Sequence, residues 1–276
     1  MIAIEWMDHG TPVAQAARVL RRLQARLVHD IKRRALIRTT RSPRSETWLL
    51  AEYLWGEECA EGAALAKAIA GTGPAWLGKL LERQLADEAR HAELLRARLA
   101  ELGWRGSVRA RGGAVVRGKL WLLEQIGSRA ARDFSGGEVV PLLACAASLE
   151  ATGARVFGRH LAVLEAMEAT RGRLDPTAEV LRVILADERR HVSGCEGALR
   201  KLVTAAEAPA LARLRARIAA VDRALGVTSS VALWAVVAAL EISSDIRMSL
   251  DHPRAVFSPT RSVRSSDQPC EGTSRG

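Results

Sequence analysis

The sequence of 276 residues predicts an all-α fold: a four-helix bundle of two antiparallel helical hairpins joined by a long crossover, with extra helices at both ends. Three observations favour this class. Ala, Leu and Arg dominate the chain and aromatic residues make up only 4% of it, a composition that favours helix over sheet. Gly and Pro separate long stretches with helical periodicity. The segment LADEARH (85–91) also returns as LADERRH (185–191), with six of seven positions identical.

Residues 1–45 are expected to form a basic amphipathic helix and a linker. Between 11 and 37, apolar residues recur at spacings of three and four, which is typical of a helix with one apolar face. The stretch TTRSPRSE (39–46) breaks this pattern, and Ser45 or Thr47 is in a position to cap the next helix.

Residues 46–204 are expected to form the bundle. Helices over 46–70 and 75–102 make the first hairpin, because the GTGP segment between them is a very short turn. Helices over 138–170 and 176–204 make the second hairpin, with RGRLDPT as its turn. Each hairpin therefore carries one copy of the repeated segment in its second helix.

The connection between the hairpins, residues 103–137, includes a Gly/Arg-rich segment and a helix at 114–132. Its length suffices to run from one end of a bundle to the other, and a bundle with one long crossover is a recurring topology. At the start of the last bundle helix, Asp175 is expected to cap and Pro176 to occupy the first helical position.

The region 205–250 is expected to supply C-terminal helices over 208–225 and 228–247 that pack on the bundle. The remaining residues, 251–276, are rich in Ser, Pro and Arg and are expected to be disordered. The most apolar run, VALWAVVAAL (231–240), is too short to span a bilayer. We therefore expect no membrane association.

The charge and the cysteines limit the function classes. The formal net charge is +10, mostly from arginine, so nucleic acid is a candidate partner, although scarce aromatics weaken a base-stacking interpretation. We expect no secretory signal and a reducing, cytoplasmic location. The cysteines form no CxxC pair, which argues against a zinc ribbon or a disulfide scaffold; they are Cys59, Cys145, Cys195 and Cys270.

The repeated segments carry a chemical pattern. Glu88 and His91 are three residues apart and share one helix face, and Glu188 and His191 repeat this spacing. One such pair is common on an exposed helix. Two pairs, each in the second helix of a hairpin, indicate that the pairs face each other across the bundle.

Each first helix of a hairpin also offers a carboxylate. Glu150 lies in a helix almost devoid of other acids over its middle turns. In the first hairpin the counterpart is Glu57 or Glu58. Aligning LLA at 49–51 with LLA at 142–144 places Glu57 opposite Glu150, so we choose Glu57 and interpret Glu58 as a solvated neighbour.

Six residues are thus expected to converge on two metal ions. Four buried carboxylates without cations would be strongly unfavourable, and mixed oxygen and imidazole ligation suits iron or manganese. Asp87 and Asp187 are expected to accept the outer N–H of the opposite hairpin's histidine, Asp87 from His191 and Asp187 from His91. A solvated helix face is the alternative interpretation. The predicted ligands are Glu57, Glu88, His91, Glu150, Glu188 and His191.

At these residues the chain resembles the ferritin-like di-metal carboxylate superfamily, and most closely its rubrerythrin-like branch. The resemblance covers 46–204. It implies a carboxylate-bridged di-iron, or sometimes manganese, centre that reacts with dioxygen or peroxide. Because the sequence contains no CxxC pair, we expect no rubredoxin domain and an external electron donor protein. The segments that carry the resemblance are LWGEE (54–58), DEARH (87–91), SLEATGARVF (148–157) and DERRH (187–191).

The resemblance implies an oxidase or oxygenase that acts on a small, unidentified organic substrate. The alternatives are a tRNA-hydroxylase-like RNA-modifying enzyme, a ferroxidase or iron-storage protein, a peroxidase, and a helical binding protein without metal. An oxygenase is expected to be a monomer or a small homo-oligomer, whereas a storage cage is large. Beyond the metal centre only Tyr53, one turn before Glu57, is a candidate redox neighbour, and a core aromatic is the favoured alternative.

Overall fold

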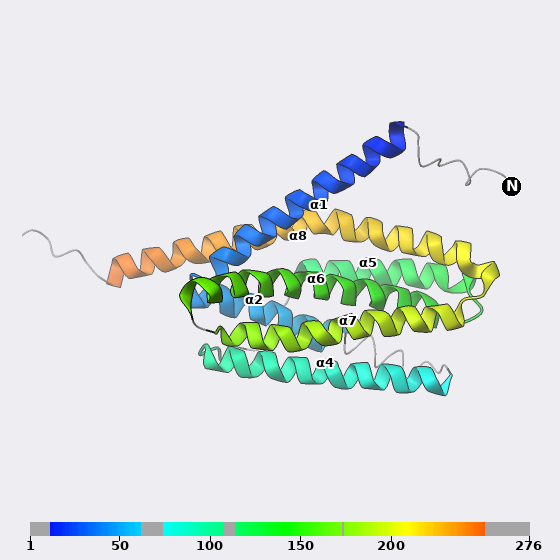
Figure 1. Cartoon of the computed structure of the whole chain (residues 1–276), viewed down its shortest axis with the longest axis horizontal. Coiled ribbons are helices and arrows are strands. Elements are labelled where there is room, and N and C mark those ends of the chain that lie inside the picture. The colour runs from blue at the N-terminus through cyan, green and yellow to red at the C-terminus, as the bar shows by residue number, and fades with distance from the viewer. Residues whose placement is uncertain (1–11, 62–73, 107–113, 173, 252–276) are drawn as a thin grey trace, which may run out of the picture. The chain divides into compact units, whose positions relative to one another are not determined.

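The structure is a computed structural model that describes residues 12–61, 74–106, 114–172 and 174–251. Within these ranges every regular element is helical, which confirms the all-α class (Figure 1). The chain divides into two compact units, Met1–Glu241 and Ile242–Gly276. The packing described below belongs to the first unit. Nearly all of the tail predicted over 251–276, the last part of the helix predicted over 46–70 and most of the predicted GTGP turn lie outside the described residues.

The helices between residues 46 and 204 begin and end within a few residues of the predicted positions. The exception is the first bundle helix, in which an α-helical stretch passes directly into a π-helical one. The elements in chain order are α1 (Pro12–Thr39), α2 (Pro43–Trp55), η1 (Gly56–Glu61), α4 (Ala75–Glu101), α5 (Ala114–Ala130), η3 (Ala131–Asp133), α6 (Val139–Arg171), α7 (Pro176–Leu202), η4 (Ala205–Glu207) and α8 (Ala208–Asp251).

The start of α2 differs from the prediction that Ser45 or Thr47 caps it. Ser42 occupies the cap position and Pro43 the first turn, while Ser45 is fully buried inside the helix. The Thr47 hydroxyl donates back to the Pro43 carbonyl at 2.6 Å. The helix begins earlier because the ring of Pro43 presets a helical φ and needs no N–H partner there.

The C-terminal region is one helix, so the prediction of two helices over 208–225 and 228–247 is wrong. Helix α8 continues through residues 226 and 227, where the break was expected. The hydroxyls of Ser229 and Ser230 both donate to the Gly226 carbonyl, and Thr228 donates to Ala224. These side chains satisfy backbone acceptors without leaving the helical conformation, and a single glycine costs a helix only about 1 kcal/mol.

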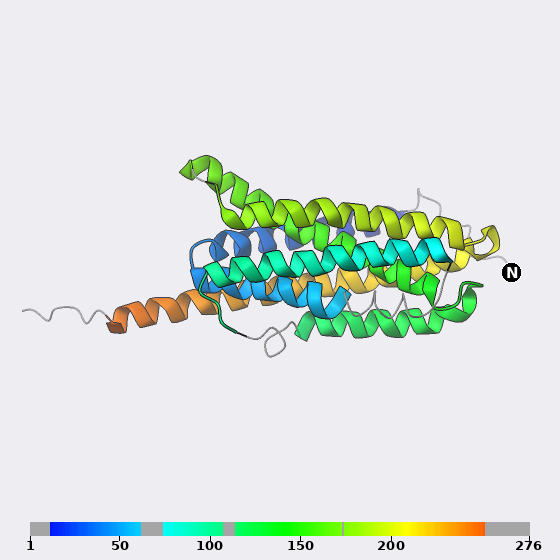
Figure 2. The same ribbon diagram turned by 90° about the horizontal axis from the view of Figure 1, so that it is seen from below.

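Four helices run side by side around the centre of the first unit: α2, α4, α6 and α7 (Figures 1 and 2). The turn from α6 to α7 contains Gly172 at φ +64°, a conformation that glycine adopts without strain. Asp175 then accepts from the Thr177 N–H at 2.9 Å, which is the predicted cap. Helix α1 packs on α2 and α6, and α5 packs on α6.

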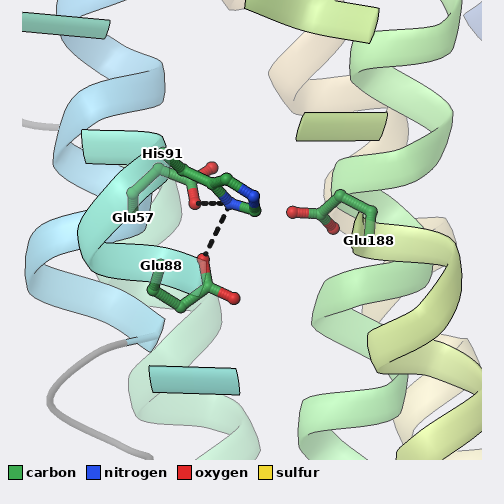
Figure 3. A group of neighbouring side chains, drawn as sticks. All are labelled: Glu57, Glu88, His91 and Glu188. Atoms are coloured by element: carbon green, nitrogen blue, oxygen red, sulfur yellow. Dashed lines mark hydrogen bonds and ion pairs between the residues drawn. The ribbon is translucent and has the colours of Figure 1, made fainter. Parts of the chain in front are cut away.

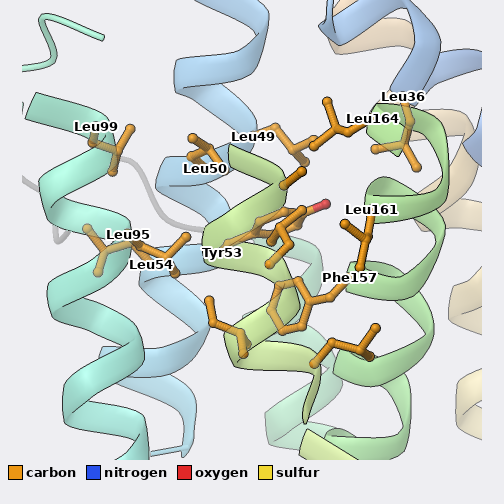
Figure 4. Packing of buried hydrophobic residues seen from close by; sticks show 14 of the residues in the cluster. Leu36, Leu49, Leu50, Tyr53, Leu54, Leu95, Leu99, Phe157, Leu161 and Leu164 are labelled. Atoms are coloured by element: carbon orange, nitrogen blue, oxygen red, sulfur yellow. The ribbon is translucent and has the colours of Figure 1, made fainter. Parts of the chain in front are cut away.

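The bundle has two apolar clusters with polar residues between them. On α4, Leu77 and Leu81 belong to one cluster and Leu95 and Leu99 to the other. The order is reversed on the antiparallel α7, where Leu181 precedes the polar stretch and Leu199 follows it. Figure 4 shows the cluster around Tyr53 and Phe157. Both helices therefore bury their repeated Glu-x-x-His segments in the same layer, with apolar packing on either side.

By length and composition alone, two helical stretches are apolar enough to cross a membrane, Val139–Thr170 and Ala205–Ser243. A core helix of a soluble protein meets the same criterion. The first stretch belongs to α6, which packs closely along α7. The second stretch begins in η4 and continues in α8. Only 11% of its most apolar window is buried, so most of that window is not covered by the rest of the protein.

Candidate metal centre

Four of the predicted ligands meet in one buried group. Glu57 of η1, Glu88 and His91 of α4, and Glu188 of α7 each offer one ligand atom, and these atoms lie within 4.8 Å of one another (Figure 3). None of the four residues is more than 3% exposed. The Nδ1 atom of His91 lies 3.1 Å from Oε2 of Glu57 and 3.4 Å from Oε2 of Glu88. This group has the composition of a site for one cation.

A second group adjoins the first and shares Glu88 with it. It consists of Glu88, Glu150 of α6 and His191 of α7, again with ligand atoms within 4.8 Å. The Nδ1 atom of His191 lies 3.0 Å from Oε1 of Glu88 and 3.3 Å from Oε2 of Glu150. The two oxygens of Glu88 therefore face different histidines, whose ring centroids are 6.0 Å apart. Glu88 has the position of a carboxylate bridge.

The structure distinguishes Glu57 from Glu58. Glu57 is 3% exposed and faces His91, whereas Glu58 is half-buried and pairs with Arg96 on the outer side of α4. Both glutamates lie in the π-helical segment η1, in which one turn is wider than in an α-helix. Such segments are frequent at functional sites because they reorient side chains on an otherwise regular helix.

Each histidine is held through its outer nitrogen. Nε2 of His91 lies 3.0 Å from Oδ2 of Asp187, and Nε2 of His191 lies 3.2 Å from Oδ2 of Asp87. These are the contacts across the hairpins that the sequence predicts. When Nε2–H donates to a carboxylate, Nδ1 carries the lone pair, and in both rings Nδ1 faces the glutamates. The orientation is that of a metal-binding imidazole.

The arginine that precedes each histidine was missed by the sequence analysis. Arg90 contacts Asp87 at 2.9 Å and also Asp187, and Arg190 contacts Asp187 and, at 3.7 Å, Asp87. The two arginines and two aspartates form a ring of opposite charges between α4 and α7. The signal was available, because both copies of the repeat contain arginine at this position.

A buried amide adjoins Glu150, and it too was missed. Nε2 of Gln84 donates to Oε1 of Glu150, and the Cys195 thiol donates to Oε1 of Gln84 at 3.8 Å. Gln84 lies one turn before Glu88 on the buried face of α4, where the other hairpin has Ile184. In the sequence, the only sign of this contact is a polar residue within the apolar stripe of α4. Because the second hairpin has Ile184 at the matching position, only one half of the centre has such an amide.

Gly153 provides space for Glu188. A Cβ atom on Gly153 would lie 2.7 Å from Oε2 of Glu188, closer than real Cβ contacts come. Glycine in the middle of a helix costs stability, and a reason for it is usually close approach of another group. Here that group is a carboxylate of the predicted site.

Burial and mutual repulsion determine the protonation of the ion-free cluster. Burial, together with Glu88 and Glu150, raises the pKa of Glu57 well above its usual value. Burial opposes protonation of His191, but its contacts with Glu150 and Glu88 prevail and raise its pKa to about 10. In the same way contacts with Glu88 and Asp187 raise the pKa of His91. Protons thus compensate the carboxylates where cations would, so the residues fit two divalent ions.

Tyr53 lies in the apolar cluster beside the centre. Its ring packs edge-on against Phe157, with centroids 4.9 Å apart, and its hydroxyl forms a hydrogen bond with Nδ1 of His160 at 3.3 Å. Burial raises the pKa of Tyr53 and lowers that of His160 to about 4, so both are neutral. These contacts are those of a core aromatic with a satisfied hydroxyl.

The structure thus brings all six predicted ligands together, with both predicted aspartates beside them. A comparison of the chain with protein-family models, curated proteins and solved structures finds no match. The interpretation of the centre therefore depends on its own geometry.

Proposed function

We propose that this protein is a di-iron, or dimanganese, carboxylate oxidoreductase with a ferritin-like bundle, which activates dioxygen or peroxide and oxidises an organic substrate. The observation that supports this best is the position of Glu88. Its two oxygens face the Nδ1 atoms of His91 and His191, one from each hairpin. A carboxylate placed between two nitrogen ligands is suited to joining two cations.

The donor set favours redox-active ions. Four carboxylates and two imidazoles surround the site, and no cysteine belongs to either group of ligand atoms in the described residues. Magnesium and calcium prefer oxygen alone, and structural zinc sites are closed by cysteine and histidine. Iron and manganese accept this mixture of ligands. When bound, such a pair of ions supplies electrons to dioxygen or peroxide.

The chain's own residues have three tasks in this scheme. Glu57, Glu88, Glu150 and Glu188 would hold the ions together with the two histidines and would balance their charge. Asp87 and Asp187 keep the two imidazoles oriented and their Nδ1 atoms unprotonated. The apolar clusters above and below the layer exclude water, which limits the escape of reactive species.

The electron balance implies a partner. Hydroxylation of a substrate by dioxygen places one oxygen atom in the product and reduces the other to water, which consumes two electrons and two protons. The sequence contains no CxxC pair for an iron–sulfur donor of its own. We therefore assign the two electrons to an external donor protein.

Anaerobic loading with ferrous iron, followed by exposure to air, tests the proposal. We expect rapid dioxygen consumption and near-ultraviolet charge-transfer absorption from wild type and from a Glu82→Ala, Glu179→Ala control, whose substituted residues are exposed on the same helices. The Glu88→Ala, Glu188→Ala variant should show neither. Equal signals from both variants would contradict the proposal. Retention of many irons per chain in a very large assembly would favour iron storage instead.

A further inference from the structure

A groove of about 660 Å³ lies between α1 and α6, away from the metal centre. None of the six predicted ligands lines it. Its basic side chains are His29 and Arg33 from α1, Arg41 from the turn that follows α1, and Arg155 and Arg159 from α6. Its volume falls within the range of small-molecule sites, roughly 300–1,000 Å³.

The arginines of the groove lack acidic partners. No carboxylate lines the groove, and in the described part of the chain none of its four arginines forms an ion pair. Arg155 donates only to the hydroxyl of Thr152, at 2.9 Å. Some arginines elsewhere are paired, for example Arg98 with Glu46 and Arg182 with Glu165. The groove is therefore a concentration of positive charge that no carboxylate in its lining compensates.

The neighbouring Lys32 is consistent with this field. Burial and the charges of Arg159, Lys119 and Arg155 lower its pKa from 10.5 to about 8. Burial and Arg155 also lower the pKa of Arg159. These cations repel one another, and a bound anion would relieve that repulsion.

The rest of the groove is apolar. Ile37 on α1 and Val163 and Met167 on α6 line it together with small alanine side chains. An inorganic anion would leave this surface unused. An extended nucleic acid would find no aromatic side chain in the groove for its bases. A molecule with an anionic head and an aliphatic chain would contact both the basic and the apolar side chains of the groove.

We propose that the groove binds an anionic amphiphile, whose carboxylate or phosphate head contacts the arginines and whose aliphatic chain lies along Ile37, Val163 and Met167. The planar guanidinium matches both head groups with paired hydrogen bonds. This proposal is independent of the metal centre, because it concerns a different face of α6 and a ligand rather than an oxidation.

Calorimetric titration of the full-length, metal-loaded protein with decanoate and decyl phosphate, each below its micellar concentration, tests the proposal. At least one of them should bind with a stoichiometry near one, and their relative affinities identify the head group. Inorganic phosphate and decanol, which carry the head or the chain alone, should each bind roughly ten-fold more weakly or not at all.

The variant Arg155→Gln, Arg159→Gln should bind the preferred alkyl anion roughly ten-fold more weakly or worse. The control Arg213→Gln, Arg217→Gln removes the same charge from exposed positions on α8 and should bind as wild type does. Ala162 is an exposed groove residue, and Ala162→Trp should block the groove without changing its charge.

Equal losses in the two arginine variants would overturn the proposal, because binding would then reflect net charge. Unchanged binding in Ala162→Trp would place the ligand elsewhere and also overturn it. Binding of a short RNA with the same dependence on Arg155 and Arg159, but of neither alkyl anion, would assign the groove to nucleic acid instead. Metal content should stay unchanged in every variant, which separates this test from that of the metal centre.

Discussion

Nε2 of His91 lies 3.0 Å from Oδ2 of Asp187, although the two residues are 96 positions apart. The same aspartate also contacts Arg90 and Arg190, so one buried carboxylate orients the imidazole and joins the two hairpins. His191 and Asp87 make the corresponding contact at 3.2 Å. The repeated DE-x-RH segment thus acts in trans: each copy orients the histidine of the other.

Asp187→Asn keeps the shape of the side chain and removes its charge. We expect roughly 10- to 100-fold weaker metal binding, because a ligating imidazole loses the acceptor that fixes its tautomer and raises its basicity. Competition with a chromophoric chelator measures this. The control Asp133→Asn changes an exposed aspartate of η3 and should bind metal as wild type does. Equal affinities in the two variants would contradict the role assigned to Asp187.

Gly153→Ala places a Cβ atom 2.7 Å from Oε2 of Glu188. We expect a loss of metal loading, because the side chain of Glu188 must move away from the new Cβ atom. The helix itself should remain folded without metal, because alanine has a higher helix propensity than glycine. Gly118→Ala is the control, since a Cβ there meets nothing within 4 Å. It should stabilise the protein by up to about 1 kcal/mol and leave metal loading unchanged. Full loading in Gly153→Ala would mean that Glu188 is no ligand.

Metal binding should release protons. In the ion-free protein the pKa of His191 is raised to about 10, so its imidazole carries an additional proton at neutral pH, and burial together with Glu88 raises the pKa of Glu57 well above its usual value. Because ligands bind metal in their deprotonated form, the affinity should increase as the pH rises from 6 to 8. Calorimetry in buffers of different ionisation enthalpy measures the protons released. An observed heat that is independent of the buffer would contradict this prediction.

Lys32→Met should stabilise the protein at neutral pH. The pKa of Lys32 is lowered from 10.5 to about 8 in the folded state, so between these values the unfolded chain binds the proton that the folded one does not. The free energy of unfolding of the wild type should therefore rise with pH between 8 and 10.5, and the destabilisation by the buried charge is complete below pH 8. Removing that charge should raise the free energy of unfolding by roughly 1 to 3 kcal/mol at pH 7 and by little above pH 10.5. Urea unfolding of both proteins at the two pH values measures the difference, and a constant difference would contradict the assignment.

Much of the centre follows from spacing alone. An interval of three residues places Glu88 beside His91 on one helix face, and the repeat predicts a partner segment on another helix. The alignment of the first helices distinguishes Glu57 from Glu58, and the structure places Glu57 inside and Glu58 outside. These predictions succeed because the spacing of two residues along an α-helix determines whether their side chains lie on the same face.

Other features depend on packing between distant segments. Gln84 contacts Glu150 across 66 positions, and its place in the apolar stripe of α4 does not show which side chain it contacts. The space that Gly153 provides becomes apparent only when Glu188 is placed beside it. The basic groove likewise requires the pairing of α1 with α6. In α8 the prediction of a break was wrong. The hydroxyls of Ser229 and Ser230 donate to the Gly226 carbonyl, and the helix continues through this segment.

The central claim is that the two hairpins together hold two metal ions joined by Glu88. Metal analysis of protein produced with iron, before and after anaerobic ferrous titration, tests it most directly. Wild type and the exposed-residue control Glu93→Gln should bind two ions per chain, one for each group of ligand atoms, and Glu88→Gln should bind fewer than one. A folded, helical wild-type protein that remains free of metal after this titration would contradict the claim.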